Sequence, residues 1–250
     1  MKNILLIILK YGLYLFFTII LLLTLKLFIF VDRKELEYPN KGRFSNYLRK
    51  DFISAEECGI CHQEIFYQWK NSAMANATVS SLFEFDLHKL SLSLRGYSEN
   101  DVEWCYQCHA PLALMEPLDL TLSDPMSKTG VTCMVCHTTA HVVADSNAGN
   151  FFLNPTLLMN GPFDDAISNF HKTNKHKLFS ENNSDLCSSC HYSVYPRNNA
   201  AIDWTWKEWD EIENNKKSCK ECHMTEYLGK SANKNWVPMR KLRNHSFKGG

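Results

Sequence analysis

The sequence predicts a mainly α-helical chain with much irregular loop, composed of one N-terminal transmembrane helix and one compact domain. Three observations predict this fold class: a long apolar run near the start, five copies of a short cysteine–histidine pattern after it, and apolar residues at helical spacing beside those patterns. We divide the chain into a transmembrane signal-anchor over 1–31, a tether over 32–53 and a single domain over 54–250.

The apolar run covers residues 4–31 and reads ILLIILKYGLYLFFTIILLLTLKLFIFV. As a helix it is long enough to cross the hydrocarbon core of a bilayer. Lys10 and Lys26 interrupt it, and their long side chains can reach opposite headgroup regions. A cleaved signal peptide is the alternative, but the run is too long for one and no A-x-A-like site follows it. We therefore expect an uncleaved anchor.

Charge excludes one class of partner. The chain has 27 Lys and Arg against 27 Asp and Glu, so composition gives no bias towards nucleic acid.

The ten cysteines all fall in pairs separated by two residues, and a histidine follows every pair. The five segments are CGICH at 58, CYQCH at 105, CMVCH at 133, CSSCH at 187 and CKECH at 219. A zinc ribbon uses two such pairs for each ion and would leave one pair unpartnered. A disulfide framework has no use for the histidines. C-x-x-C-H is instead the attachment signature of c-type haem.

Five covalently attached haems c are therefore expected. In each motif two thioether bonds hold the porphyrin, and the adjacent imidazole is held beneath the iron as the proximal ligand. The expected attachment residues are Cys58, Cys61, Cys105, Cys108, Cys133, Cys136, Cys187, Cys190, Cys219 and Cys222. The expected proximal ligands are His62, His109, His137, His191 and His223.

Secondary structure around the motifs is expected to be helical or irregular. A capping box of Ser54 and Glu57 predicts the start of a helix over 54–77. Its expected apolar stripe is Ile65, Trp69 and Ala73. A second helix is predicted over 203–217, with the stripe Ile202, Trp206, Trp209 and Ile212. The segment 149–166 is loop-like, no strand is predicted, and the irregular motif intervals indicate one domain without repeats.

The sixth coordination positions have several candidates. Five histidines lie outside the motifs, which matches the number needed for full bis-histidine ligation: His88, His141, His171, His176 and His245. His141 lies four residues after His137, and a helical relation would place both on one side, so we expect His141 to serve a neighbouring haem.

The chain resembles multihaem c-type cytochromes of the cytochrome c-552/4 type, which are related to the tetrahaem cytochrome c of ammonia oxidisers. The resemblance rests on the ordered segments CGICHQEIFYQWKNSAM, CYQCHAP, GVTCMVCH, GPFDDAISNFH, CSSCH, WKEWDE, CKECHM and NHSFKGG. It implies closely packed haems, export of the domain, and His171 and His245 as distal ligands. Similar sequences often have histidine where this chain has Met74, and a thioether ligand would raise the potential of that haem. Similar chains also often continue past the last glycine, so this chain is either a compact form or a fragment.

Export places the domain on the periplasmic or outer face of the cytoplasmic membrane. The function expected is electron transfer to and from redox partner proteins and possible exchange with the quinone pool, with carrier favoured over catalyst and no catalytic side chain expected. The alternatives are a quinol dehydrogenase that feeds a terminal reductase, and an oxidoreductase for nitrogen or sulfur compounds with one open haem. A gas sensor is disfavoured because no signalling domain is appended.

Overall fold

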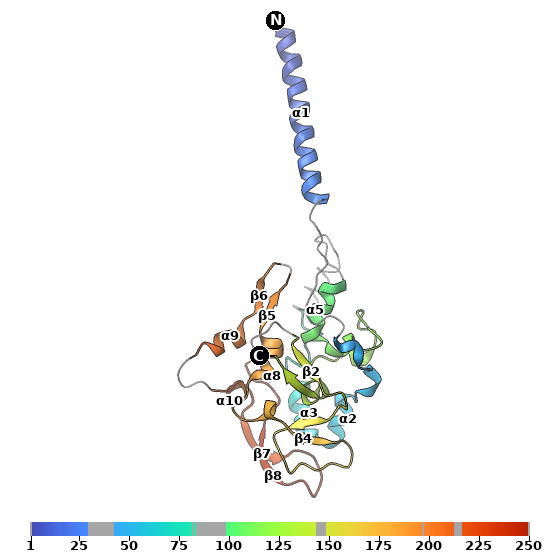
Figure 1. The fold of residues 1–250 in the computed structure, drawn as a ribbon, viewed down its shortest axis with the longest axis vertical. Helices are drawn as coiled ribbons and strands as arrows, with labels where there is room; N and C mark the ends of the chain where they lie inside the picture. Colours follow the sequence, from blue (N-terminus) through green and yellow to red (C-terminus); the bar gives the residue numbers. More distant parts are fainter. Residues whose placement is uncertain are drawn as a thin grey trace. The chain divides into compact units, whose positions relative to one another are not determined.

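The computed structural model describes residues 2–29, 43–81, 83, 99–143, 149–196, 198–212 and 217–249 (Figure 1). The chain divides into two compact units, Met1–Glu35 and Leu36–Gly250. His88 and residues 32–42 of the predicted tether lie outside the described residues. The described part of the tether forms two short 3-10 helices, η1 (Arg43–Asn46) and η2 (Arg49–Asp51), where the sequence showed no helical period.

The first unit contains the helix α1 (Lys2–Ile29). The helical conformation of the apolar run is thus confirmed. Side chains are described for residues 10–24, and all of them are exposed. Within the part of the chain that the structure describes, no helix combines the length and the apolar character needed to cross a membrane. The transmembrane assignment therefore stays a prediction.

The second unit is built from short helices joined by irregular segments, as the sequence predicted. Besides η1 and η2, the helices that the structure describes in this unit are α2 (Ala55–Cys61), α3 (Gln63–Lys70), α5 (Glu99–His109), η3 (Pro111–Leu114), α6 (Pro125–Lys128), α7 (Cys133–His137), η4 (Lys177–Phe179), α8 (Asp185–His191), α9 (Thr205–Asp210) and α10 (Cys219–His223).

Two predicted helices are shorter than expected. The helix expected over 54–77 begins with the predicted capping box of Ser54 and Glu57, but it breaks at His62, whose φ of −97° and ψ of 47° leave the helical region. It ends at Lys70, so Trp69 is buried while Ala73 is exposed. The helix expected over 203–217 is observed only as α9, and residues 213–216 lie outside the described residues. Ile202 of its predicted stripe lies instead in a strand, with 61% of its surface exposed.

The expectation that the chain has no strands is wrong. Among the described residues, short strands pair into four two-stranded sheets. The pairs are β1 (Thr139–Val142) with β2 (Phe151–Leu153), β3 (Met159–Gly161) with β4 (Thr173–Lys175), β5 (Ser193–Tyr195) with β6 (Ala200–Asp203), and β7 (Glu226–Lys230) with β8 (Met239–Arg243). All are antiparallel except β3 with β4. Strands of three to five residues are too short to show an alternating pattern, which explains why the sequence did not reveal them.

The main hydrophobic cluster surrounds η3 and α7. Leu112, Ala113 and Met115 are fully buried, and Met134 and Val135 of α7 pack into the same cluster. Phe151 and Leu153 close it from β2. By contrast, large apolar side chains of the second unit are exposed near the β7–β8 hairpin and the 162–171 segment: Ile167, Phe170, Leu228, Trp236 and Met239. The packed core thus supports the central motifs, with less side-chain packing around the others.

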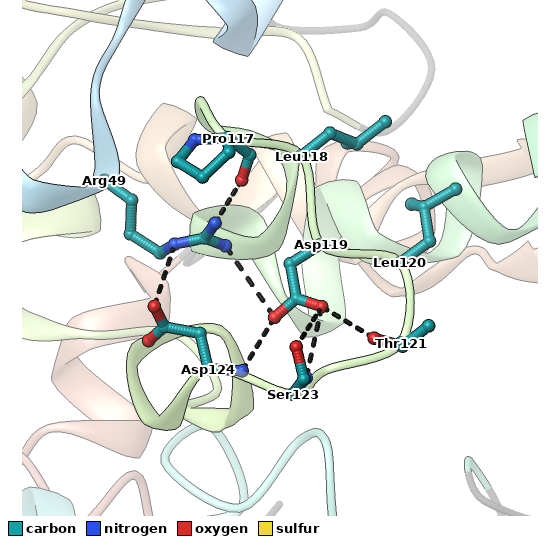
Figure 2. Close-up of a pocket in the computed structure, with 8 residues that line it drawn as sticks. All are labelled: Arg49, Pro117, Leu118, Asp119, Leu120, Thr121, Ser123 and Asp124. Carbon is teal, nitrogen blue, oxygen red and sulfur yellow. Dashed lines mark hydrogen bonds and ion pairs between the residues drawn. The ribbon is translucent and has the colours of Figure 1, made fainter.

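Next to this cluster, an ion network joins η2 to the segment that follows η3 (Figure 2). The buried Arg49 guanidinium lies 3.9 Å from Asp119 and 3.6 Å from Asp124. It also donates hydrogen bonds to the hydroxyl of Ser127 and to the carbonyl of Pro117. None of these residues belongs to a C-x-x-C-H motif, so we assign the network a structural role.

Candidate haem sites

Each C-x-x-C-H motif ends one of the short helices. We call the motifs sites 1 to 5 in chain order, by their histidines His62, His109, His137, His191 and His223. Helical spacing places the first cysteine three residues from the second and four from the histidine, so that all three share one face. Side-chain caps from Ser54 and Thr132 start the helices of sites 1 and 3. At site 5 the Glu221 carboxylate accepts from the backbone N–H of Ser218, directly before the first cysteine, at 2.6 Å. The local sequence therefore fixes the geometry that attachment requires.

The Nδ1 atom of every motif histidine contacts an oxygen atom. The contacts join His62 to the Ser231 carbonyl at 2.5 Å, His109 to that of Ala77 at 3.0 Å, His137 to that of Asn160 at 2.7 Å, His191 to the Asp203 carboxylate at 3.2 Å and His223 to the Lys248 carbonyl at 2.8 Å. A carbonyl only accepts, so Nδ1 carries the proton wherever the partner is a carbonyl. Nε2 then carries the free lone pair with which an imidazole binds a metal.

Two motif histidines face a second imidazole in the described part of the chain. The ring centroids of His62 and His171 are 6.1 Å apart, and those of His137 and His245 are 6.3 Å apart. Two imidazoles on opposite sides of one metal ion, each with a metal–nitrogen bond of about 2 Å, place their centroids about 6 Å apart. Both pairs therefore have the spacing of a bis-histidine metal site.

The environment of these rings favours the neutral form that binds metal. Burial and the neighbouring His137 together lower the pKa of His245 to about 4. Burial likewise lowers the pKa of His137 and of His171. The Nδ1 atom of His171 is buried and has no hydrogen-bond partner among the described residues. A buried polar atom left without a partner is costly, and a metal ion would provide one.

Hydrogen bonds hold the second member of each pair in place. The backbone N–H of His171 donates to the hydroxyl of Ser168 at 3.3 Å. The backbone N–H of His245 donates to the side-chain oxygen of Gln68 in α3 at 3.0 Å, and its Nδ1 contacts the Arg243 carbonyl at 2.8 Å. The segment after β8 therefore places His245 opposite site 3 and the Lys248 carbonyl against site 5.

The other predicted distal ligands are placed differently. His88 lies outside the described residues. His141 is exposed on β1 beside Phe152; because α7 ends at His137, the expected helical relation between His137 and His141 does not exist. His176 precedes η4, where its Nδ1 accepts from the Leu178 N–H. Met74 is half-buried after α3, and its carbonyl accepts from the Val131 N–H at 2.9 Å.

Contacts between cysteines show which sites are neighbours. Cys58 lies beside Cys133, Cys108 beside Cys190, and Cys187 beside Cys219. Helix α2 packs on α7, and α5 packs on α8, in agreement with the first two contacts. Site 1 therefore adjoins site 3, and site 4 adjoins both site 2 and site 5. Cys136 of site 3 also lies near Cys190 of site 4.

Several residues at these sites had no signal in the sequence. Phe83 stacks on the His109 ring at 4.2 Å, and Phe179 stacks on His137 at 5.0 Å. Asp203, Gln68 and Asn160 orient histidines from other elements. Their roles depend on contacts between distant segments, and no local pattern marks them.

Comparison with known proteins agrees with this chemistry. Residues 57–138 match the family model described as cytochrome c554 and c-prime. A crystal structure of a penta-heme cytochrome c552 from Thermochromatium tepidum matches with a TM-score of 0.57 and 21% sequence identity, covering 79% of this chain and 57% of that one. The chain thus spans little more than half the length of that structure. No curated protein matches significantly.

The five motifs and the oriented imidazoles define a multihaem c-type cytochrome, a protein that carries covalently attached haem c. Within that class, the sequence of sites 1 to 3 is similar to the cytochrome c554 and c-prime family, and the fold is similar to that of a penta-heme cytochrome c552.

Proposed function

We propose that the chain is a membrane-anchored pentahaem cytochrome that relays electrons on the outer side of the cytoplasmic membrane. The observation that carries the proposal is the shared arrangement of the five motif histidines, each with Nδ1 against an oxygen atom and Nε2 left for a metal. Each haem c supplies a one-electron ferric–ferrous couple when bound.

Sites 1 and 3 are proposed as bis-histidine sites, with His171 opposite His62 and His245 opposite His137. A six-coordinate iron has no open position for a substrate, so such sites suit electron transfer rather than catalysis. Sites 2, 4 and 5 take their distal ligands from His88, His141, His176 and Met74 in this proposal. The structure pairs none of the described members of this group with a motif ring in the way that it pairs His171 and His245.

The adjacency of the sites supports a relay. Cysteine contacts link site 1 to site 3, and site 4 to sites 2 and 5. Site 5 is the most open of these, because both Cys222 and His223 are exposed. We propose site 5 as the point of exchange with a partner protein. Haem propionates add negative charge to a chain whose formal net charge is zero, which favours basic docking surfaces on that partner.

Anchoring is proposed from the first unit. The side chains of residues 10–24 in α1 are exposed, and apolar residues occupy most of these positions. A contiguous apolar surface of this kind favours contact with lipid or protein. Covalent haem attachment outside the cytoplasm then places the domain on the periplasmic or outer face. Recovery of the full chain in the soluble fraction after cell lysis, without detergent, would contradict the anchor.

The decisive experiment combines a pyridine haemochrome assay with the spin state of the ferric protein. We expect five haems per chain and predominantly low-spin iron. Fewer than five haems would overturn the pentahaem assignment. A high-spin fraction that binds carbon monoxide on reduction would favour the alternative of an oxidoreductase with one open haem, at site 2, 4 or 5. Rapid reduction of the protein in liposomes by a menaquinol analogue would favour the quinol dehydrogenase.

A further inference from the structure

One of the five sites differs from the others in the atom that orients its histidine. At sites 1, 2, 3 and 5 the partner of Nδ1 is a neutral backbone carbonyl. At site 4 the partner is the carboxylate of Asp203, whose Oδ2 lies 3.2 Å from Nδ1 of His191. Site 4 is therefore the one described site where a charged group acts directly on the proximal histidine.

The position of Asp203 is set by the β5–β6 hairpin. Strand β5 begins two residues after His191, and its first residue, Ser193, pairs with Asp203 at the end of β6. This pairing places the Asp203 carboxylate next to the motif that ends at His191. The other carboxylate oxygen, Oδ1, accepts from the backbone N–H of Thr205 at 2.9 Å, and the Thr205 hydroxyl also hydrogen-bonds to the carboxylate.

The contact is partly shielded from water. The Asp203 side chain is 30% exposed and the His191 side chain is 45% exposed. Trp204 and Trp206 follow Asp203 in the sequence, and the rings of both pack on Tyr192, the residue after His191. A charge in such a position acts on its neighbour more strongly than it would in bulk water.

We propose that Asp203 is a positioning residue that lowers the reduction potential of the haem iron held by His191. A carboxylate draws the Nδ1 proton towards itself and makes the imidazole a more basic ligand. A more basic ligand stabilises the ferric iron, which carries one more positive charge than the ferrous iron. The negative charge of the carboxylate acts in the same direction. The inference rests on the proposed ligation at site 4.

The consequence concerns the relay itself. Site 4 adjoins sites 2 and 5, and its Cys190 also lies near Cys136 of site 3. Site 4 thus has several neighbouring sites, and its haem would have a lower reduction potential than theirs if the ligands were otherwise the same. Electrons would be held there less often than at neighbouring sites with the same ligands.

The competing explanation is that Asp203 serves only to start α9. Substitution by asparagine distinguishes the two roles, since its side-chain oxygen caps a helix about as well as aspartate but carries no charge. In the Asp203→Asn variant we expect one haem couple to shift so that its ratio of reduced to oxidised form rises about tenfold at a given potential. That change corresponds to +59 mV for a one-electron couple. The visible spectrum should stay that of the wild type.

Two further variants make the test directional. Thr205→Val removes a hydroxyl that shares the carboxylate charge, so we expect the same couple to shift the opposite way. Asp164→Asn removes an exposed carboxylate that pairs with Lys175 and serves as the matched control for loss of one negative charge. All variants are titrated potentiometrically as full-length holoprotein.

The proposal is overturned if no couple rises more in Asp203→Asn than in Asp164→Asn. It is also overturned if Thr205→Val moves the couple upward. If Asp203→Asn incorporates fewer haems than the wild type, the direction of the Thr205→Val shift decides. Absence of haem from the peptide that contains Cys187 and Cys190, measured by mass spectrometry in the wild type, would instead refute the proposed ligation at site 4.

Discussion

His171 lies opposite His62, with ring centroids 6.1 Å apart and the ring planes tilted by 33°. The two residues are separated by more than a hundred positions in the sequence, and the 162–171 segment brings them together. His62 is oriented by the Ser231 carbonyl, which comes from the turn after β7. Site 1 is therefore assembled from three distant parts of the chain, and each of them can be perturbed separately.

Removal of the second imidazole should open site 1. In His171→Ala we expect a high-spin ferric component corresponding to one haem, together with carbon monoxide binding on reduction, because the iron loses its sixth ligand. Absorbance and electron paramagnetic resonance spectra measure both effects. Phe170→Ala is the matched control, since Phe170 is adjacent but 76% exposed. An unchanged low-spin spectrum in His171→Ala would refute the pairing.

The hydrogen bond from His245 to Gln68 should hold site 3 in its six-coordinate form. Gln68→Ala removes the acceptor of the His245 backbone N–H, so we expect a partial high-spin signal and a loss of about 1 kcal/mol in the free energy of unfolding. Gln63→Ala is the control on the same helix, because Gln63 accepts a hydrogen bond from Asn233 instead. Identical spectra for the two variants would show that Gln68 does not position His245.

The buried guanidinium of Arg49 should be a major source of stability. Arg49→Ala leaves Asp119 buried without its cation (Figure 2), and breaking such a pair costs about 3–5 kcal/mol. Denaturant unfolding of the holoprotein, followed by far-ultraviolet circular dichroism, measures the loss. Lys175→Ala breaks the exposed pair with Asp164 and should cost at most about 1 kcal/mol. Equal losses in the two variants would contradict the structural role of Arg49.

Asp119 should contribute to the acid sensitivity of the fold. Burial raises the pKa of its carboxyl group, but hydrogen bonds from the backbone of Asp124 and Ser123 and from the side chains of Ser127 and Thr121 outweigh burial and leave the pKa below its usual value. The folded state therefore favours the charged form. This stabilisation is complete above the ordinary pKa of about 3.9 and is lost as the pH falls through the lower folded value.

The corresponding measurement is the unfolding free energy of wild type and Asp119→Asn between pH 7 and pH 2. We expect the variant to be less stable at pH 7 and the difference to shrink below about pH 4. Asp165→Asn is a suitable control, because its carboxylate pairs with Arg240 at an exposed position. A wild-type advantage that stays constant down to pH 2 would show that the charge of Asp119 is not responsible.

The sequence by itself predicts where haem is attached. Thioether formation and proximal ligation both involve residues within five consecutive positions, so the local spacing of cysteine and histidine is enough to predict them. The helix start at Ser54 and Glu57 was predictable for the same reason, because a capping box closes within one turn. The mainly helical, irregular character of the second unit followed from equally local patterns.

Tertiary structure alone decided which groups complete the sites. A backbone carbonyl such as that of Ser231, 169 residues from His62, has no sequence signature, because every residue has one. The pairing of His137 with His245, and the placement of Asp203 by the register of a short hairpin, likewise depend on how distant segments pack. Local chemistry fixes attachment, whereas orientation and potential depend on contacts that exist only after the chain has folded.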